Sequence, residues 1–314
     1  MKILLTGVSG QLGHALQKQL AGAHTLITPT RAQMDLSQPW QIEDTIRSVR
    51  PDLIINPAAY TAVDLAESEP ELALQINAVA PAVMAAEAKA LGIGLIHYST
   101  DYVFDGGKAD ADGNWLAYTE QDRTAPLNVY GETKLAGEQA IRASGCAHLI
   151  FRTSWVYSLH GKNFLLTMLK LASERDQLRV VDDQWGVPNS ADWLASVSVE
   201  ILAQAGAASS SPRWWQEFSG LYHLSASGRT NWCEFARSIM RNAEKLGLLQ
   251  TAAPQITGIA SSEYPTAARR PQNSLLNSAC LQQRFNVLLP DWEQNLRRCL
   301  QKMQTQRPLQ DVVN

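Results

Sequence analysis

The chain has 314 residues, of which 45% are hydrophobic and 18% are charged, and its formal net charge is −3. This length allows one large α/β domain with a smaller lobe, or two linked domains. The slightly acidic balance, without any basic block, gives no reason to expect a nucleic-acid or anionic-membrane partner. No apolar run reaches the roughly 20 residues that cross a bilayer.

The N-terminal apolar run, Met1–Leu5, stops at Thr6 and Gly7, which favours a buried strand over an export signal. The four cysteines form no CxxC pair and have no histidines at zinc-like spacing. They are predicted to be reduced thiols in a cytoplasmic protein. They are Cys146, Cys233, Cys280 and Cys299.

Short apolar runs alternate with longer helix-like stretches in the first half of the chain. We expect strands over residues 2–6, 25–28, 52–56, 94–99 and 147–152, and helices over residues 11–21, 40–49, 70–91 and 129–143. Pro81 is expected to divide the third helix into two. Strands that are apolar throughout, each followed by a helix, predict an α/β fold with a Rossmann-type, doubly wound parallel sheet.

The second half is less regular. We expect helices over residues 163–174, 191–205, 232–246 and 291–303, and a Ser-rich surface loop over residues 207–212. The predicted organisation is a Rossmann domain over residues 1–155 and a smaller, mainly substrate-binding lobe over residues 156–314. A segment of roughly residues 180–232 is expected to return to the first domain.

The first predicted strand leads directly into a glycine-rich turn, Gly7–Gly13, which opens the first helix. Such a turn presents backbone N–H groups and the positive end of a helix to a pyrophosphate. Position, spacing and the following βαβ rhythm together predict a dinucleotide-binding turn. Its expected cofactor-binding residues are Gly7, Ser9, Gly10, Gln11, Leu12 and Gly13.

The end of the second strand bears on the choice of cofactor. An acid there usually binds the ribose 2′-hydroxyl of NAD, but this chain has Thr28-Pro29-Thr30-Arg31. Arg31 could bind the 2′-phosphate of NADPH, which is therefore favoured, with NADH possible. The alternative is that Arg31 is a solvated surface charge. Further expected cofactor contacts are Asp35, Leu36, Ala58, Ala59 and Tyr60.

A YxxxK pair, Tyr130 and Lys134, lies on one face of the fourth helix, and Thr100 follows the strand that ends at Ser99. Reduction of a ketone by hydride leaves an alkoxide that needs a proton. An ammonium near Tyr130 would lower the phenol pKa from about 10 toward the working range. We therefore expect Thr100, Tyr130 and Lys134 to be catalytic, with Tyr130 and Lys134 also contacting the cofactor.

The GxxGxxG spacing and this triad resemble the extended branch of the short-chain dehydrogenase superfamily. Longer segments resemble the dTDP-4-dehydrorhamnose reductases, namely residues 61–70, 97–104, 126–131, 151–157 and 270–274. The resemblance implies NAD(P)H-dependent reduction of the C4 ketone of a dTDP-4-dehydro-6-deoxy sugar. It also implies sugar-nucleotide contacts from Val63, Asp64, Thr100, Asp101, Tyr102, Trp155, Asn163 and Arg270.

The chain departs from the family's pattern at one place. Relatives often dimerise through a magnesium site of acidic side chains. Here Asp192 and Glu293 match two of its positions, but the third is Ala15. Loss of one ligand weakens binding of a hard cation. We therefore predict no metal and a monomer or weak homodimer.

Two other functions stay open. A sugar-nucleotide epimerase, or another reductase of this fold, shares the same motifs; a dehydratase is disfavoured because Asp101 is followed by Tyr102 rather than by Glu. A non-catalytic regulatory subunit, resembling the β subunit of methionine adenosyltransferase, would bind the cofactor without turnover.

Overall fold

The computed structural model describes residues 1–205 and 212–306. Its centre is a six-stranded sheet in the order β10-β5-β4-β3-β1-β2, in which every neighbouring pair is parallel. The strands are β1 (Lys2–Leu5), β2 (Thr25–Ile27), β3 (Leu53–Asn56), β4 (Gly94–Thr100), β5 (Ala147–Thr153) and β10 (Gly220–His223). This confirms the predicted doubly wound α/β fold.

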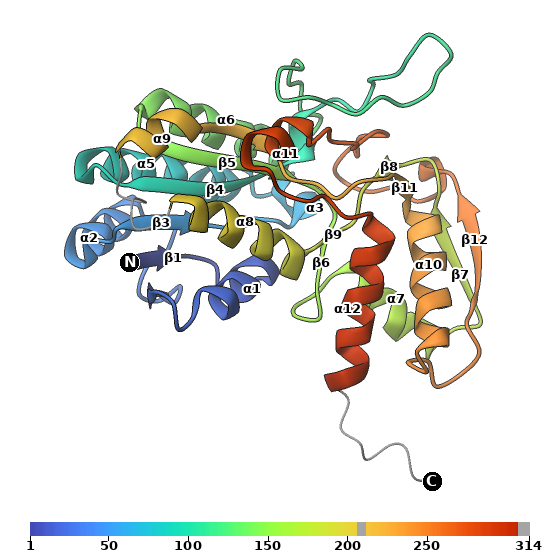
Figure 1. Cartoon of the computed structure of the whole chain (residues 1–314). Helices are drawn as coiled ribbons and strands as arrows, with labels where there is room; N and C mark the ends of the chain where they lie inside the picture. The colour runs from blue at the N-terminus through green and yellow to red at the C-terminus, as the bar shows by residue number, and fades with distance from the viewer. Residues whose placement is uncertain (206–211, 307–314) are drawn as a thin grey trace.

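Helices cover both faces of the sheet (Figure 1). On one face, Ile3 and Leu5 of β1 pack with Leu16 of α1 (Gln11–Leu20) and Leu194 of α8 (Ala191–Ala205). On the other face, Leu4 packs with three further helices. These are α2 (Pro39–Val49), α5 (Ala80–Leu91) and α6 (Val129–Ser144). Alternate side chains of one strand therefore pack into two separate hydrophobic cores, one on each face of the sheet, which explains why the strands are apolar throughout.

The predicted break at Pro81 is wrong. The chain runs through α4 (Pro70–Leu74) and a π-helical turn (Gln75–Val79) directly into α5. Pro81 lies in the first turn of α5, where a missing N–H is tolerated most easily. The wider π turn before it absorbs the local change in hydrogen bonding.

A second lobe packs around Leu165, Phe235 and Leu296. Its helices are α7 (Phe164–Ala172), α10 (Trp232–Lys245) and α12 (Trp292–Gln306), and β7 (Gln177–Val181) pairs in parallel with β12 (Gln255–Ile259). Figure 1 shows this lobe beside the carboxyl ends of the central strands. The β7–β12 pair and β10 were not predicted from the sequence.

The chain passes between the lobes more than once. Helix α8 and strand β10 fall within the segment expected to return to the sheet, and both pack there; α11 (Ala279–Phe285) returns as well. Residues 207–211 of the predicted Ser-rich loop lie outside the described residues, and Pro212 begins α9 (Pro212–Phe218). The remaining short elements are α3 (Val63–Ala66), β6 (Val156–Tyr157), β8 (Trp185–Gly186), β9 (Asn189–Ser190), β11 (Thr230–Asn231) and two 3₁₀ turns, Asp101–Val103 and Ser261–Glu263.

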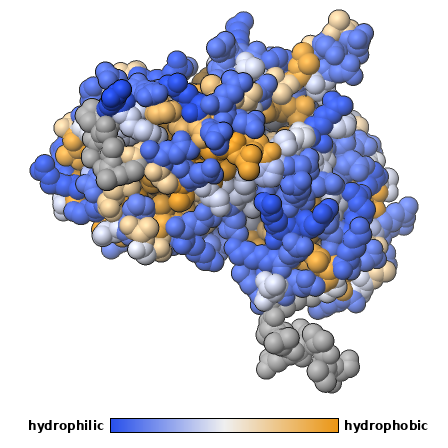
Figure 2. Space-filling view, viewed as in Figure 1, coloured by the Kyte–Doolittle hydropathy of each residue, from blue (hydrophilic) through white to orange (hydrophobic). Residues whose placement is uncertain are grey.

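Polar and charged residues cover most of the face seen in Figure 2, with hydrophobic residues in separate patches. Across the part of the chain that the structure describes, none of the helices is both long and apolar enough to span a bilayer.

Candidate functional site

A cavity of about 1010 Å³ lies where the lobes meet, at the carboxyl ends of β1, β3, β4 and β5. This is where open parallel α/β sheets bind ligands. It brings together most of the residues that the sequence predicted for the site. These are Gly7, Ser9, Gly10, Gln11, Leu12, Gly13, Arg31, Asp35, Leu36, Ala58, Ala59, Val63, Thr100, Asp101, Tyr102, Tyr130, Lys134, Trp155 and Asn163.

Three predicted residues, Tyr60, Asp64 and Arg270, do not line this cavity. The phenol of Tyr60 donates a 2.6 Å hydrogen bond to the Glu69 carboxylate. The guanidinium of Arg270 donates to the carboxylate of Asp64, also at 2.6 Å. Their predicted contacts with cofactor and substrate remain predictions.

The glycine-rich turn has the close backbone packing that a dinucleotide turn requires. Gly7 has a φ of +62°, and a Cβ there would lie 2.9 Å from the backbone of Ala58. A Cβ on Gly13 would lie 2.1 Å from the Gly7 carbonyl oxygen. The N-cap of α1 is Gly10, which has no side chain to cap the first N–H groups of the helix. The turn therefore fits a pyrophosphate at the start of α1.

At the cavity rim, the Arg31 side chain is 76% exposed and lies 3.6 Å from the Asp35 carboxylate. The backbone N–H of Ser37, which donates to Asp35, is the main cause of a lowered Asp35 pKa. Asp35 is therefore an anion beside the exposed guanidinium of Arg31 at the cavity rim.

Helix α6 carries the predicted catalytic pair and begins with a firm cap. The Asn128 side chain accepts from the Gly131 N–H at 2.8 Å and donates to the Arg269 carbonyl at 2.8 Å. The cap thus fixes the first turn, which holds Tyr130, and links it to the loop of Arg269. The Tyr102 ring packs edge-on against the Tyr130 ring, with centroids 5.7 Å apart.

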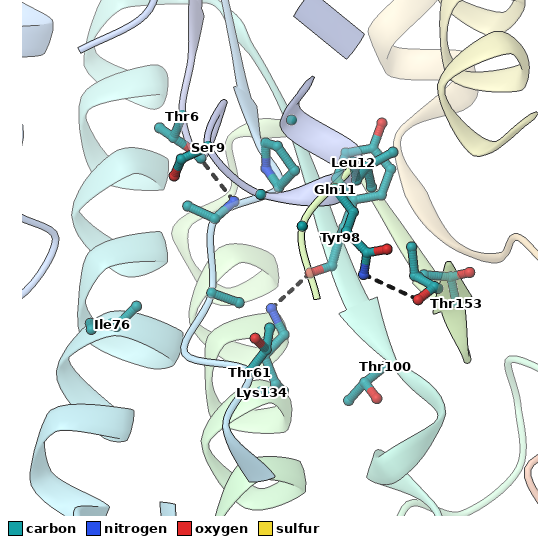
Figure 3. Close-up of a pocket in the computed structure, with 18 of the residues that line it drawn as sticks. Thr6, Ser9, Gln11, Leu12, Thr61, Ile76, Tyr98, Thr100, Lys134 and Thr153 are labelled. Carbon is teal, nitrogen blue, oxygen red and sulfur yellow. Dashed lines mark hydrogen bonds between the residues drawn. The ribbon is translucent and has the colours of Figure 1, made fainter. Parts of the chain in front are cut away.

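Burial shifts both members of the pair. Lys134 is 1% exposed, and its ammonium donates to the Tyr98 carbonyl oxygen at 2.7 Å (Figure 3). Loss of hydration lowers the Lys134 pKa to about 8 and raises the Tyr130 pKa to about 12. The lowered Tyr130 pKa expected from the sequence is therefore wrong for this structure, because burial has the larger effect.

Three buried polar atoms lining the cavity, Ser99 Oγ, Asp101 Oδ2 and Thr153 Oγ1, have no hydrogen-bond partner within residues 1–205 and 212–306. Buried polar atoms are normally paired, so these three residues stand out among those that line the cavity. Burial also raises the Asp101 pKa to about 6. Sequence reasoning missed Ser99 and Thr153, although both lie at the carboxyl ends of strands, which is the usual signal.

Aromatic rings form the wall on the second-lobe side. Trp155 has a φ of +45°, which a bulky residue rarely adopts, and its ring stacks on Trp232 with centroids 3.6 Å apart. A Cβ on Gly186 would lie 2.6 Å from the Trp155 ring, so only glycine leaves room for it. Trp232 was missed because no local pattern connects it with a segment so distant along the chain.

Asn163 and Lys162 lie on the same side of the cavity. The Asn163 amide accepts from the Leu166 N–H and donates to the Ser158 carbonyl, so it caps α7 as well as lining the cavity. Lys162 is exposed and was not singled out by the sequence. A cation at this rim suits a phosphorylated ligand.

The positions that match the family's magnesium site lie elsewhere. Ala15 is buried, the Asp192 carboxylate accepts from the Lys302 ammonium at 2.6 Å, and the Glu293 carboxylate accepts from the Ser238 hydroxyl at 3.0 Å. Among the described residues, no group of three or more His, Cys, Asp or Glu side chains is placed to hold a metal ion.

Comparison with known proteins agrees with this architecture. The family model described as "RmlD substrate binding domain" matches residues 1–305. A dTDP-4-dehydrorhamnose reductase of Escherichia coli strain K12 is 46% identical over 309 residues, covering 97% of this chain and 99% of the relative.

Two solved structures share the fold over nearly the whole chain. A dTDP-4-dehydrorhamnose reductase of Clostridium acetobutylicum has a TM-score of 0.85 at 33% identity, covering 97% of this chain and 100% of that one. The Bacillus anthracis enzyme of the same name, in complex with NADP, also has a TM-score of 0.85, at 31% identity, with 96% and 99% covered. The chain therefore belongs to the dTDP-4-dehydrorhamnose reductase family.

Proposed function

We propose that this chain reduces the C4 ketone of dTDP-4-dehydro-6-deoxy-L-mannose to dTDP-L-rhamnose, with NADPH as the favoured reductant and NADH as a possible one. The observation that carries the proposal is the meeting of the Gly7–Gly13 turn with Thr100, Tyr130 and Lys134 in one cavity. The names of the full-length relatives support the substrate, and the NADP bound to the Bacillus anthracis enzyme supports the cofactor.

Each residue has a defined task in this reaction. The bound nicotinamide supplies the hydride. Tyr130 donates the proton that the developing alkoxide requires, and Thr100 holds the ketone oxygen beside it. Lys134 presents an ammonium to the cavity and favours the phenolate left on Tyr130. The stacked Trp155 and Trp232 exclude water on the side of the second lobe.

The turn after β1 and the rim of the cavity bind the cofactor. The N–H groups at the start of α1 bind the pyrophosphate, and the small side chains of Ala58 and Ala59 let the dinucleotide approach the backbone. Arg31 binds the ribose phosphate. On the opposite side, Asp101 and Tyr102 contact the sugar.

The deciding experiment is turnover of NADPH with the dTDP-4-keto-6-deoxy sugar, with product identified by chromatography and mass spectrometry. Wild-type protein should consume one NADPH per rhamnose nucleotide formed. Tyr130→Phe should lose at least ~100-fold in kcat, the usual scale of acid–base assistance. Tyr264→Phe, at a tyrosine that is 62% exposed, is the matched control.

Three results would contradict the proposal. Isomerised sugar without net NADPH consumption would indicate an epimerase. Cofactor binding with no turnover would favour a regulatory subunit. Equal rates for wild type and Tyr130→Phe would remove Tyr130 from the mechanism. A cytoplasmic location and a monomer or weak homodimer, without nucleic-acid or membrane partners, complete the proposal.

A further inference from the structure

A row of buried polar side chains joins two residues that line the cavity, Thr6 and Lys134, through two that do not, Asn56 and His97. It runs from Thr6, after β1, through Asn56 of β3 and His97 of β4 to Lys134 of α6, and each residue is at most 2% exposed. The Thr6 hydroxyl donates to Asn56 Oδ1 at 2.6 Å. Asn56 Nδ2 lies 3.1 Å from His97 Nδ1, and His97 Nε2 lies 3.2 Å from Lys134 Nζ.

The His97 ring is neutral in this position. It is fully buried, and loss of hydration, followed by the charge of Lys134, holds its pKa well below the usual value. Glu138 lies one helical turn beyond Lys134, and its carboxylate raises the Lys134 pKa and is itself bound by Arg152 at 2.6 Å. A neutral imidazole has one donor nitrogen and one acceptor nitrogen.

The charge of Lys134 decides which nitrogen is the acceptor. An ammonium has three N–H donors and no acceptor, so His97 Nε2 must accept and Nδ1 must carry the hydrogen. Nδ1–H then donates to the Asn56 amide oxygen, with the amide turned so that its NH₂ faces Thr6. If Lys134 were a neutral amine, the Asn56 amide would keep its oxygen toward Thr6 and donate from Nδ2 to His97 Nδ1, and Nε2–H would donate to the amine. The Asn56 amide can therefore pair with either tautomer of His97, and the charge of Lys134 selects between them.

We propose that His97 is a positioning residue for Lys134, accepting one ammonium N–H through Nε2 while the Tyr98 carbonyl accepts a second. The third N–H is then left for the cavity, which Lys134 lines. The two acceptors fix the direction of the ammonium and stabilise its charge in a buried place. This inference rests on the proposed reduction, because only turnover reports the charge of Lys134 at the reacting centre.

The test compares two substitutions that preserve different ends of the imidazole. His97→Gln places an amide oxygen near the position of Nε2, whereas His97→Asn keeps a polar atom only near Nδ1. We expect His97→Asn to lose ~10- to 100-fold in kcat, the scale of a lost hydrogen bond to a charged group. The KM for the sugar nucleotide should stay within about twofold, and His97→Gln should recover most of the rate.

The pH profile separates positioning from general packing. Removal of an acceptor disfavours the ammonium, so in His97→Asn the alkaline decline of kcat should begin at lower pH than in wild type. His223→Asn truncates a second fully buried histidine, in β10 at the sheet edge. In this variant the alkaline decline of kcat should begin at the same pH as in wild type. If His97→Asn does not fold, Asn56→Asp serves instead, because an acceptor-only carboxylate locks Nε2 as an acceptor. Its alkaline decline should begin at higher pH.

The outcomes separate a failure of the proposed reduction from a failure of the role given to His97. Absence of turnover in the wild type would overturn the proposed function itself. Turnover in the wild type, with His97→Asn and His97→Gln equal in rate and in pH profile, would overturn the role of His97 alone. An unshifted profile in a folded Asn56→Asp protein would do the same.

Discussion

The guanidinium of Arg270 donates to the carboxylate of Asp64 at 2.6 Å, joining residues that stand 206 positions apart in the chain. The same carboxylate accepts from the Ala268 N–H at 3.0 Å. Together these bonds hold the loop before Pro271 against α3, beside the cavity. The Arg270 side chain is 19% exposed and that of Asp64 48% exposed, so the pair contributes no more than ~1 kcal/mol to stability.

Arg270 and Asp64 should therefore differ in kinetics more than in stability. If Arg270 also binds the diphosphate of the substrate, Arg270→Ala should raise the KM for the sugar nucleotide about tenfold. Asp64→Asn, which leaves the guanidinium in place, should change it less than ~3-fold. Steady-state kinetics and thermal melts on both variants give the comparison. Equal KM increases would mean that Arg270 serves only to hold the loop.

Arg31 should determine the preference between the two nicotinamide cofactors. It lines the cavity rim, and its side chain is 76% exposed although it lies 3.6 Å from the Asp35 carboxylate. Arg31→Ala should raise the KM for NADPH about tenfold, because a charge-assisted contact is lost. The KM for NADH, which has no 2′-phosphate, should change less than ~2-fold. An unchanged KM for NADPH would identify Arg31 as a solvated surface charge.

Gly13→Ala should disrupt the pyrophosphate turn. The added Cβ would lie 2.1 Å from the Gly7 carbonyl oxygen, a contact with backbone that cannot be relieved by a rotamer change. Gly107→Ala is the matched control, since its Cβ would meet nothing closer than 3.7 Å. By fluorescence titration we expect Gly13→Ala to bind NADPH at least ~10-fold more weakly than wild type, and Gly107→Ala to bind it as tightly as wild type. Normal binding by a folded Gly13→Ala protein would contradict the assignment of the turn.

Asn128 should stabilise the helix that carries Tyr130 and Lys134. Asn128→Ala removes the acceptor for the Gly131 N–H and should lower the free energy of unfolding by ~1 kcal/mol. Asn128→Asp retains the cap but loses the donor to the Arg269 carbonyl, so it should fall between wild type and Asn128→Ala. Chemical denaturation followed by circular dichroism gives the order. A different order would mean that the Arg269 contact matters more than the cap.

Asp101 should lower the stability of the unliganded protein at neutral pH. Burial raises its folded-state pKa to about 6 from 3.8. The charged form therefore costs up to ~3 kcal/mol above pH 6, and this cost disappears as the pH falls toward 4. Asp101→Asn should be more stable than wild type at pH 7.5, with the difference closing at pH 4, while its turnover falls.

Asp105 is a control for this measurement, because its pKa is lowered where that of Asp101 is raised. The Tyr118 hydroxyl lowers the Asp105 pKa, so Asp105→Asn should lose stability at pH 7.5, and this loss should shrink as the pH falls. Thermal melts across this pH range would settle both directions. An Asp101→Asn protein no more stable than wild type at pH 7.5 would contradict the cost assigned to Asp101.

The sequence predicted well what depends on local pattern. Successive residues of a strand point to opposite faces of the sheet, and in β1 Leu4 packs against the helices on one face and Leu5 against those on the other. Because both faces are covered, the strands are apolar throughout, and this pattern was enough to indicate a parallel sheet. The Gly7–Gly13 turn and the Tyr130–Lys134 pair are also local, because their geometry follows from one βα junction and one helical turn. The predicted break at Pro81 failed because a π turn changes the hydrogen-bond pattern before the proline.

Contacts between distant segments were decided only by the tertiary structure. The stacking of Trp155 on Trp232, the pairing of Arg270 with Asp64, and the row from Thr6 to Lys134 each join residues from different elements. No spacing in the sequence encodes them, since they depend on how strands are ordered and how the second lobe meets the first. The sequence by itself indicated which groups are candidates for the chemistry. The fold decided which of them share a cavity, which are held by one another, and how far burial shifts their pKa values, because hydration is lost only when the whole chain packs.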